Sequence, residues 1–553
     1  MTLVWFSNLE MRKLVRPDEG RYAEIPREMV ATGDWLTPRL DGYKYFEKPP
    51  LQYWMTAAAY EALGEYRWTS RLWAALTGIL GLMSVTYCGW RILGREAGIY
   101  AGLVLGSTLL YAGMAHVNTL DMGVTCFMTI TLCAFLLAQR DGATLQETRS
   151  WMWLAWAATG LAVLSKGLEG VVLPGAVFML YTVVQRDAAI WKKLYPVAGI
   201  IIFLAICAPW FVMVSLANPE FPHFFFIHEH FERFLTKEHH RYQPFWYFIP
   251  ILLAFLLPWT VLALDGLLVA WRSQPAQKFR PLRFLLIWSA FIFVFFSASG
   301  SKLIPYILPI FPSLALLLGA RLPQIAPRRF MWSLVPVVAL ATGGLAFAPF
   351  MPRLADEGFA PYLQRFASDE VPPALFEAFM PWLIAGCALM LTACIAAIVA
   401  IRRQRRELAV VLLAGGGLLF AQAILTGHDS FAPSHSSYDL IRRAESQPGV
   451  ARLLDDAATP FYSVGMYEQT LPFYIKRTVT LVAHEDELEF GIGVEPQKYV
   501  PTVEEFMRRW RADTRALAIM QPDRYRELAA AGLPMHPLVQ DRRRVIVART
   551  ESP

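Results

Sequence analysis

Long apolar runs alternate with short polar segments over the first 427 residues of the chain. Twelve of these runs are close to 20 residues long and carry few charged side chains. The hydrocarbon core of a bilayer is about 30 Å thick and offers backbone groups no partner, so runs of this length suit spanning α-helices. The pattern predicts an all-α polytopic membrane domain over residues 1–427. The runs cover residues 68–90, 97–116, 120–139, 151–165, 168–185, 196–217, 246–271, 282–299, 302–320, 330–350, 379–401 and 408–427.

The pattern changes after residue 427, where the chain is polar and its apolar runs are short. Several of these runs are rich in β-branched residues, which is typical of strands. Thr502 and Glu505 have the spacing of a helix capping box, in which each side chain satisfies a backbone amide of the other. We therefore expect residues 428–553 to form a small α/β domain. Its strands are expected at Pro460–Gly465, Thr478–Val482, Ala516–Met520 and Arg544–Ala548.

Composition agrees with a membrane protein, and the distribution of charge gives its orientation. Hydrophobic residues make up 55% of the chain and charged residues 17%, with a mean hydropathy of +0.37. Alternate short loops between the runs hold 18 Lys and Arg, whereas the other short loops hold four. Positive charge collects in cytoplasmic loops. This places the N-terminal segment 1–67, the loop 218–244 and the C-terminal tail outside the cytoplasm. The same uneven distribution argues against nucleic-acid binding as the reason for the net charge of +6.

All six cysteines fall inside the apolar runs, and the exported domain has none. We therefore expect neither a disulfide framework nor a zinc–thiolate site.

Ionisable and aromatic residues collect at the ends of the runs on the outer side. Each of them alone has an ordinary explanation, since charged side chains at helix ends commonly meet water or lipid headgroups. Lys166 and Lys302 differ, because they are cations in very short outer loops where positive charge is disfavoured. Asp121 lies at a span boundary, where ionisable groups tend to mark a pathway or site. Pro49 and Pro50 stop a helix directly after Lys48 and restrict its backbone.

Cations beside a few carboxylates at a membrane surface suit a lipid phosphate. Lys and Arg both neutralise phosphate, Arg through a planar fork and Lys as a point charge. We expect a cavity lined by Lys48, Lys166, Arg233 and Lys302, with Tyr306 as a further hydrogen-bond donor. An acid such as Asp18 could bind a hydroxyl or amino group of a substrate, or act as a base. A donor with a long lipid tail would explain why such a site lies in a membrane protein.

Four segments of the chain resemble one family of membrane enzymes. They are "RPDEGRYAEI" (16–25), "YFEKPPLQYW" (45–54), "HEHFERF" (228–234) and "SKLIPYILPIFP" (301–312). The chain is similar in these segments to the bacterial 4-amino-4-deoxy-L-arabinose transferases that modify lipid A. These enzymes have the GT-C fold and are related to protein O-mannosyltransferases. The acidic pair Asp18-Glu19 resembles the pair of acidic residues that is typical of that superfamily in its first outer loop.

The resemblance implies a donor, an acceptor and a location. The donor is undecaprenyl phosphate carrying aminoarabinose, and the acceptor is a phosphate of lipid A. The reaction takes place at the periplasmic face of the inner membrane and gives resistance to polymyxin and cationic peptides. We expect a monomer with no required cofactor.

The resemblance also implies residue roles. Asp18 is the principal essential carboxylate, and Asp121, Lys48 and Arg21 are expected to take part in catalysis with it. An adventitious zinc ion could be held by Glu47, His228 and His230, but no metal is expected to be required. The residues expected to bind substrate are Glu47, Tyr45, Lys166, Arg233, Lys302 and Tyr306.

The chain departs from the family at its start. The family has thirteen spans, with a full helix before the acidic motif, whereas only "MTLVWFSNL" precedes it here, so we expect a truncated first helix.

Two alternative functions remain. A related GT-C enzyme, such as a protein O-mannosyltransferase, would use another acceptor. A lipid flippase would need two alternating faces, yet the ionisable residues gather on one side and no inverted repeat is visible.

Overall fold

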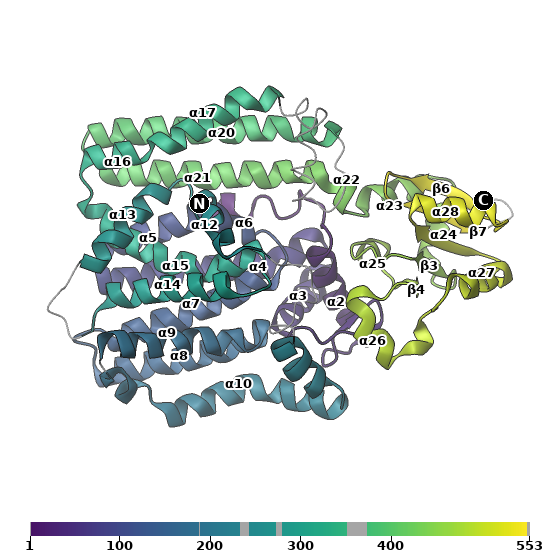
Figure 1. The fold of residues 1–553 in the computed structure, drawn as a ribbon, viewed down its shortest axis with the longest axis horizontal. Helices are drawn as coiled ribbons and strands as arrows, with labels where there is room; N and C mark the ends of the chain where they lie inside the picture. Colours follow the sequence, from purple (N-terminus) through teal and green to yellow (C-terminus); the bar gives the residue numbers. More distant parts are fainter. Residues whose placement is uncertain (1, 187, 233–242, 273–278, 351–372, 550–553) are drawn as a thin grey trace.

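Helices packed side by side make up the larger part of the molecule (Figure 1). The structure, a computed structural model, describes residues 2–186, 188–232, 243–272, 279–350 and 373–549. The helices of the first half are α1 (Thr2–Phe6), α2 (Asp18–Thr32), α3 (Leu51–Leu63), α4 (Arg67–Leu93), α5 (Arg95–Ser107), α6 (Leu109–Met114), α7 (Leu120–Gln139), α8 (Leu145–Lys166), α9 (Glu169–Gln185), α10 (Pro196–Ala217) and the π-helix η2 (His223–Glu232). Those that follow in the bundle are α12 (Phe248–Phe255), α13 (Thr260–Arg272), α14 (Pro281–Ala298), the 3₁₀-helix η4 (Ile304–Ile310), α15 (Phe311–Arg321), α16 (Pro327–Ser333), α17 (Val335–Phe347), α20 (Pro373–Arg402) and α21 (Arg406–His428).

Every predicted apolar run is largely helical. Within the described residues, eight helices are long and apolar enough to cross a membrane, or nine if one bent pair counts as a span. The bent pair is the predicted run 246–271, where α12 and α13 meet at 115°. Pro258 lies at this break, and proline has no amide to continue a helix. The run 97–116 is likewise divided into α5 and α6.

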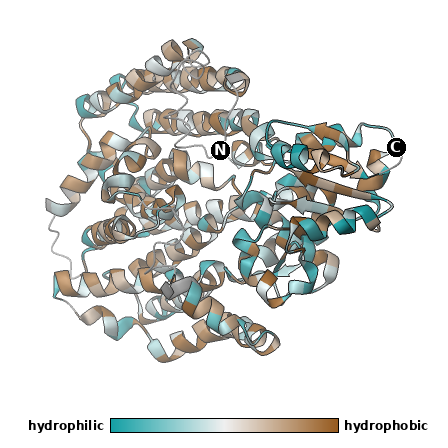
Figure 2. Ribbon diagram, turned by 45° about the vertical axis from the view of Figure 1, so that its right-hand side comes forward, coloured by the Kyte–Doolittle hydropathy of each residue, from teal (hydrophilic) through white to brown (hydrophobic). Residues whose placement is uncertain are grey.

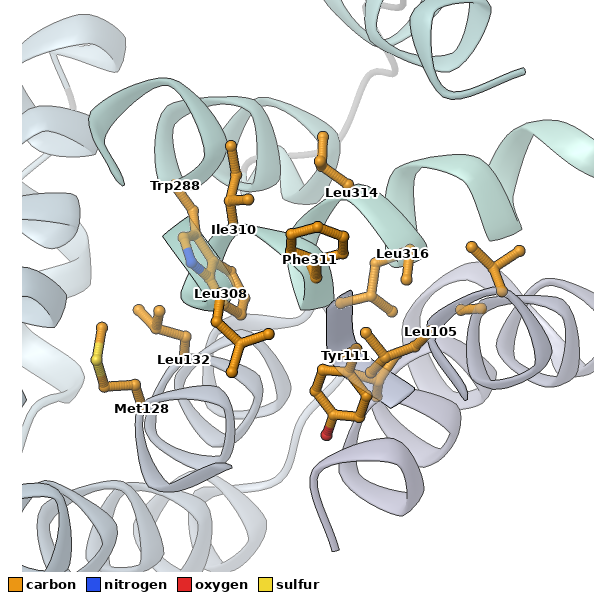
Figure 3. Close-up of a cluster of buried hydrophobic side chains, with 14 of the residues drawn as sticks. Leu105, Tyr111, Met128, Leu132, Trp288, Leu308, Ile310, Phe311, Leu314 and Leu316 are labelled. Carbon is orange, nitrogen blue, oxygen red and sulfur yellow. The ribbon is translucent and has the colours of Figure 1, made fainter. Parts of the chain in front are cut away.

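Large side chains fill the centre of the bundle where α5, α6, α7, α14, η4 and α15 meet (Figure 3). Tyr111 and Trp288 are both fully buried there. The hydroxyl of Tyr111 donates to the carbonyl of Gly78 at 2.8 Å, and the indole N–H of Trp288 donates to Pro309 at 3.0 Å. Their rings therefore add apolar contact area without leaving a buried donor unpaired. Apolar residues predominate along the bundle, whereas the C-terminal part mixes apolar and polar residues (Figure 2).

The N-terminal segment 1–67 is more ordered than the predicted outer loop. It contains α2, α3 and a two-stranded hairpin between them, with strands β1 (Arg39–Leu40) and β2 (Tyr43–Lys44). The sequence pattern did not predict α3, which begins directly after Pro50. Most of α2 is buried although many of its side chains are polar, so its neighbours must supply polar partners.

Five strands form one mixed sheet near the C-terminus. They are β3 (Phe461–Val464), β4 (Thr480–Val482), β5 (Ala516–Met520), β6 (His536–Gln540) and β7 (Val545–Arg549). Their order is β4-β3-β5-β7-β6; β3 is parallel to β4 and β5, and β7 is antiparallel to β5 and β6. The four predicted strands are confirmed. The sequence prediction missed β6, which contains His, Pro and Gln rather than a β-branched run.

Short helices surround this sheet. Thr502 caps one of them by accepting a hydrogen bond from the amide of Glu505 at 3.2 Å, which is one half of the predicted capping box. These helices are α22 (Ala432–His435), α23 (Tyr438–Glu445), α24 (Val450–Asp455), α25 (Leu471–Ile475), α26 (Glu489–Val494), α27 (Val503–Ala512) and α28 (Pro522–Ala530).

The N-terminal segment and the C-terminal sheet domain share one core. Buried residues of α2 and the hairpin, such as Ile25 and Leu40, belong to the same apolar cluster as Phe461 and Leu481 of the sheet. Figure 1 shows α2 against this domain. Polar contacts support the packing, including an ion pair of 2.9 Å between Arg39 and Glu495. The two segments therefore lie on one side of the bundle, in agreement with the distribution of charge.

Three carboxyl groups are buried at this contact. Glu28 accepts a hydrogen bond from the amide of Gly42, and Asp41 accepts one from Val479 at 2.7 Å. Burial, together with the charge of nearby Glu24, raises the pKa of Glu28 from its ordinary value of 4.5 to about 8. Burial also raises the pKa values of Glu24 and Asp41, although Arg27 pairs with Glu24. The contact therefore favours the protonated form of these acids.

The raised pKa of Glu28 predicts a loss of stability with rising pH. Between about pH 4.5 and 8, Glu28 holds its proton in the folded protein and loses it in the unfolded chain, so folding becomes less favourable across this window. We expect the unfolding temperature of the wild type in detergent to fall from pH 5 to pH 8. Glu28→Gln should reduce that fall, because glutamine stays neutral.

A matched control for Glu28→Gln is Glu527→Gln on α28, where the side chain is 63% exposed and should leave the pH dependence unchanged. Scanning fluorimetry at several pH values measures the effect. Equal pH slopes in the wild type and Glu28→Gln would contradict the assignment.

Candidate active site

The acidic pair at the start of α2 divides into two different environments. The helix begins at Asp18, so both acids lie in its first turn, where the helix dipole favours negative charge. Consecutive helical side chains point in different directions, about 100° apart. The Asp18 side chain is 47% exposed, whereas the Glu19 side chain is 1% exposed. The two acids therefore serve different purposes.

Glu19 forms a buried bidentate ion pair with Arg71 of α4. Its carboxylate accepts hydrogen bonds from the Arg71 guanidinium at 2.7 and 2.8 Å. It also accepts the backbone amide of Asn118 at 3.1 Å and that of Val15 at 3.2 Å. Burial acts to raise the pKa of Glu19, but the charge and hydrogen bonds of Arg71 outweigh it and lower the pKa to about 2. Glu19 is thus an ionised structural group that ties α2 to α4 and to the segment before α7.

The other N–H groups of Arg71 bind backbone carbonyls of the N-terminal stretch. Nη1 donates to Leu9 at 2.7 Å and to Arg12 at 2.8 Å, and Nη2 donates to Lys13 at 3.0 Å. The guanidinium therefore makes hydrogen bonds along most of its edge, which offsets part of the cost of burying its charge.

Asp18 belongs to a separate group around Arg21, one helical turn further on. Arg21 is buried, and its guanidinium donates to the Tyr45 hydroxyl at 2.7 Å. It lies 3.8 Å from the Glu47 carboxylate and 3.6 Å from that of Asp18. Burial acts to lower the pKa of Arg21, but the negative groups around it outweigh burial and raise the pKa, so it stays charged. Four of the predicted site residues are therefore brought together.

A second group forms where α7 begins and α8 ends. The ammonium of Lys166 lies 2.8 Å from Asp121 and 3.6 Å from Glu169, and it sits over the ring of Tyr306 at 4.6 Å. These residues come from three distant parts of the sequence. Asp121 therefore acts first as a partner that holds the Lys166 ammonium in place.

Hydrogen bonds also link the start of α3 to the segment before α7. Lys48 donates to the carbonyl of Glu47 at 2.8 Å, just before the prolines that precede α3. In the first turn of α3, the Gln52 amide donates to the Asn118 side chain at 2.8 Å. Asn118 also binds Glu19 through its backbone, and it lies three residues before Asp121. The first turns of α2, α3 and α7 thus meet at one end of the bundle.

The remaining predicted site residues lie partly outside these groups. Lys302 is buried, and its ammonium donates to the backbone carbonyls of Gln243 at 2.9 Å and Ser299. Arg233 and the side chain of His230 lie outside the described residues.

The proposed zinc ligands are only partly described. His228 stacks on Phe224 at 5.2 Å, and Phe224 in turn stacks on Phe490 of the C-terminal domain at 3.9 Å. Glu47 lies beside Arg21. Within the described part of the chain, no three His, Cys, Asp or Glu side chains are arranged to hold a metal ion.

Two important residues were not predicted from sequence. Arg71 resembles an ordinary cation near the start of a spanning helix, because its partner Glu19 is 52 residues away. Glu487 of the C-terminal domain forms an ion pair of 2.8 Å with Arg21. It lies in an acidic stretch, "HEDELEF" (484–490), that carries no recognisable motif.

Family models match both parts of the chain. The model described as aminoarabinose transferase C-terminal domain matches residues 450–549. The model described as dolichyl-phosphate-mannose-protein mannosyltransferase matches residues 47–213.

Curated proteins and a solved structure are similar to the chain. Two relatives carry the name undecaprenyl phosphate-alpha-4-amino-4-deoxy-L-arabinose arabinosyl transferase. The one from Aeromonas salmonicida is 34% identical over 58% of each chain, and the one from Erwinia tasmaniensis is 30% identical over 70% of each chain. The crystal structure of ArnT from Cupriavidus metallidurans bound to undecaprenyl phosphate has a TM-score of 0.91 and 38% identity. It covers 100% of this chain and 97% of its own.

The two environments predict losses of stability of different size for substitutions of the two acids. Glu19→Gln leaves the buried Arg71 without its carboxylate, so we expect it to destabilise the protein by about 3–5 kcal/mol. Asp18→Asn removes a half-exposed charge and should cost less than about 1 kcal/mol. Unfolding of purified variants in detergent measures the difference. Equal stability of the two variants would contradict the separation of roles.

Proposed function

The chain belongs to the family of undecaprenyl phosphate–4-amino-4-deoxy-L-arabinose arabinosyl transferases, and we propose that it moves this aminosugar from undecaprenyl phosphate to a phosphate of lipid A. It is a multi-pass protein of the inner membrane. We further propose that transfer takes place at the periplasmic face and lowers the affinity of polymyxin and cationic peptides for the cell surface.

The observation that carries the proposal is the polar group of Asp18, Arg21, Tyr45 and Glu47. It lies where the N-terminal segment meets the C-terminal domain, at one end of an apolar bundle. An apolar lipid tail suits the bundle, and charged headgroups suit this polar end. The alignment with the Aeromonas salmonicida relative spans 58% of that protein. We therefore assign the activity of that relative to this chain as part of the proposal.

The proposed reaction exchanges one phosphate for another at the anomeric carbon. An oxygen of the lipid A phosphate forms a bond to this carbon, and the bond to the donor phosphate breaks with its electron pair leaving on undecaprenyl phosphate. A phosphate monoester is already ionised near neutral pH, with a second pKa of about 6, so the nucleophile needs no base. The larger obstacle is repulsion between two anionic lipids.

The cations of the site would reduce this repulsion. We assign the two phosphates to Lys48, Lys166, Arg233 and Lys302, which would stabilise the attacking oxygen and the leaving phosphate. Asp121 would hold Lys166 for this role, at 2.8 Å. Asp18 would orient the sugar by binding the sugar's ammonium group, or it would orient the attacking phosphate through Arg21. A role of Asp18 as a base is the second choice.

Reconstitution tests the function. Purified protein in liposomes with lipid A and undecaprenyl phosphate-aminoarabinose should add one aminopentose to lipid A, as measured by mass spectrometry. Asp18→Asn should reduce the rate at least about 100-fold, because transfer depends on a correctly oriented sugar. A near wild-type rate in Asp18→Asn would contradict the role of Asp18.

The same assay separates the alternatives. Transfer of the sugar to protein would favour a mannosyltransferase-like activity. Movement of an unchanged donor across the bilayer would favour a flippase.

We also propose that transfer requires no metal ion. The nucleophile is ionised without a metal, and the side-chain cations of the site would supply the positive charge. The rate should therefore stay unchanged when EDTA is added to the liposome assay. A loss of activity in EDTA that zinc or magnesium restores would overturn this part of the proposal.

A further inference from the structure

We propose that Gln52, Trp73 and Ser165 border a niche beside Gly123 that binds one hydroxyl group of the donor's sugar. The four residues come from α3, α4, α8 and α7, which approach one another where α7 begins and α8 ends. The inference rests on the proposed function and deepens it, because it names the residues by which the chain would recognise the sugar. The transfer reaction as proposed uses none of these four residues.

Gly123 is a buried glycine in the first turn of α7, and its surroundings do not require a glycine. A Cβ atom at this position would lie 3.6 Å from Trp73 Nε1, 3.7 Å from Ser165 Oγ and 3.9 Å from Gln52 Oε1. These are ordinary contact distances, so alanine would fit. Alanine also stabilises a helix more than glycine does. What glycine contributes at this position is therefore the space itself.

The three atoms nearest to this space all form hydrogen bonds. Trp73 Nε1 is a donor, and Gln52 Oε1 is an acceptor. The hydroxyl of Ser165 donates to the carbonyl of Leu161 at 2.8 Å, which leaves its oxygen to accept. A group that both donates and accepts, such as a hydroxyl, matches this set. An ammonium group only donates and would face the indole N–H, so it does not match.

The side chain of Gln52 is held in place with its oxygen at the niche. Gln52 is 2% exposed, and its amide nitrogen donates to the side chain of Asn118 at 2.8 Å. Within the described part of the chain, Gln52 Oε1 has no hydrogen-bond partner. A buried acceptor without a donor is costly, so a group that donates to it is favoured.

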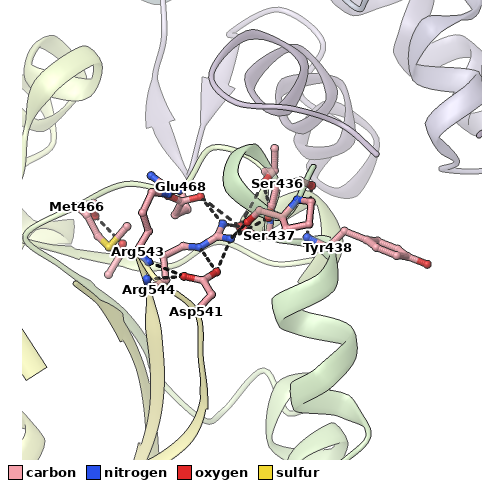
Figure 4. Close-up of polar contacts among 11 residues, drawn as sticks. Ser436, Ser437, Tyr438, Met466, Glu468, Asp541, Arg543 and Arg544 are labelled. Carbon is pink, nitrogen blue, oxygen red and sulfur yellow. Dashed lines mark hydrogen bonds and ion pairs between the residues drawn. The ribbon is translucent and has the colours of Figure 1, made fainter. Parts of the chain in front are cut away.

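A buried polar group with a structural role looks different in this protein. Arg544 is 1% exposed, and its guanidinium donates to Asp541 at 2.6 Å, to Glu468 at 2.9 Å and to the carbonyl of Ser436 at 3.0 Å (Figure 4). The chain itself supplies these partners. Other buried polar atoms among the described residues also lack a partner, but Gln52 Oε1 borders a space that a glycine keeps open.

The niche lies next to residues that the proposed function assigns to the site. Asp121 is two residues before Gly123, and Lys166 directly follows Ser165. Trp73 is only half-buried, so the niche lies near the surface of the helices. Lys166 is assigned to a phosphate, and the donor's sugar is bonded directly to its phosphate. A niche beside Lys166 therefore suits a hydroxyl of that sugar.

The first test fills the niche. In Gly123→Ala the added methyl group should exclude the hydroxyl and lower kcat/KM for the donor about 10-fold, the scale of one lost hydrogen bond. The unfolding temperature should not fall, since alanine is the better helix former. The matched control is Gly266→Ala on α13, beside the last turns of α15. It is another buried helical glycine, where a Cβ would lie 3.6 Å from the carbonyl oxygen of Leu317, and it should keep the wild-type kcat/KM.

A second variant removes an acceptor and adds no bulk. Ser165→Ala should lower kcat/KM in the same direction as Gly123→Ala. Its control is Ser84→Ala, which removes a hydroxyl with the same local bond, to the carbonyl of Leu80 at 2.8 Å, on an exposed face of α4. This control should keep the wild-type kcat/KM.

Donors that lack one hydroxyl show what occupies the niche. The aminopentose has two free hydroxyl groups, so two deoxy donors would be tested, each linked to undecaprenyl phosphate. The wild type should use one of them about 10-fold less efficiently, because Gln52 loses its partner. With that donor Gly123→Ala should cause no further loss, since the two changes remove the same contact. With the other deoxy donor the loss caused by Gly123→Ala should remain.

The outcomes separate this inference from the proposed function. A wild-type kcat/KM in both Gly123→Ala and Ser165→Ala would overturn the inference. Equal losses in Gly123→Ala with all three donors would also overturn it, because the niche would then hold only water. If the wild type transfers no sugar from the complete donor in the same liposomes, the proposed function fails instead.

Discussion

The buried ion pair between Glu19 and Arg71 is the constraint on which the arrangement of the site depends. Two charges are removed from water there, which is costly unless the remaining donors and acceptors are satisfied. The backbone carbonyls of Leu9, Arg12 and Lys13 accept the other guanidinium N–H groups, and the amide of Asn118 reaches the carboxylate. Because the pair lies beneath the first turn of α2, it fixes which way that turn faces and leaves Asp18 toward solvent.

A polar contact between the N-terminal segment and the C-terminal domain extends this arrangement. Buried Asp41 binds a backbone amide across it, and Gly20 lets backbone from the domain touch the first turn of α2. Apolar packing alone would tolerate small shifts between the two parts. Hydrogen bonds and ion pairs tolerate them poorly, so a polar contact of this kind keeps the site residues of both parts in register.

The sequence predicts the parts of the fold that depend on local pattern. The apolar runs give helices because their length and composition leave no other membrane-spanning structure, and β-branched runs mark four of the five strands of the C-terminal sheet. The motif near position 18 and the "YFEKPP" stretch predict that Asp18, Tyr45 and Glu47 belong together. Features that depend on distant partners escape the same reasoning. The different burial of Asp18 and Glu19 is decided by Arg71, and the contribution of Glu487 comes from a residue 466 positions away from Arg21. The bend of 115° between α12 and α13 also cannot be read from an unbroken apolar run.

Hydrogen exchange at the first turn of α2 tests the central claim most directly. Exchange of a peptide covering residues 14–24 would be measured in the wild type, Glu19→Gln, Arg71→Met and the double variant. If the buried pair fixes this turn, each single variant loses protection there, and the double variant recovers part of it because neither charge of the pair is left without the other. Unchanged protection in both single variants would contradict the account.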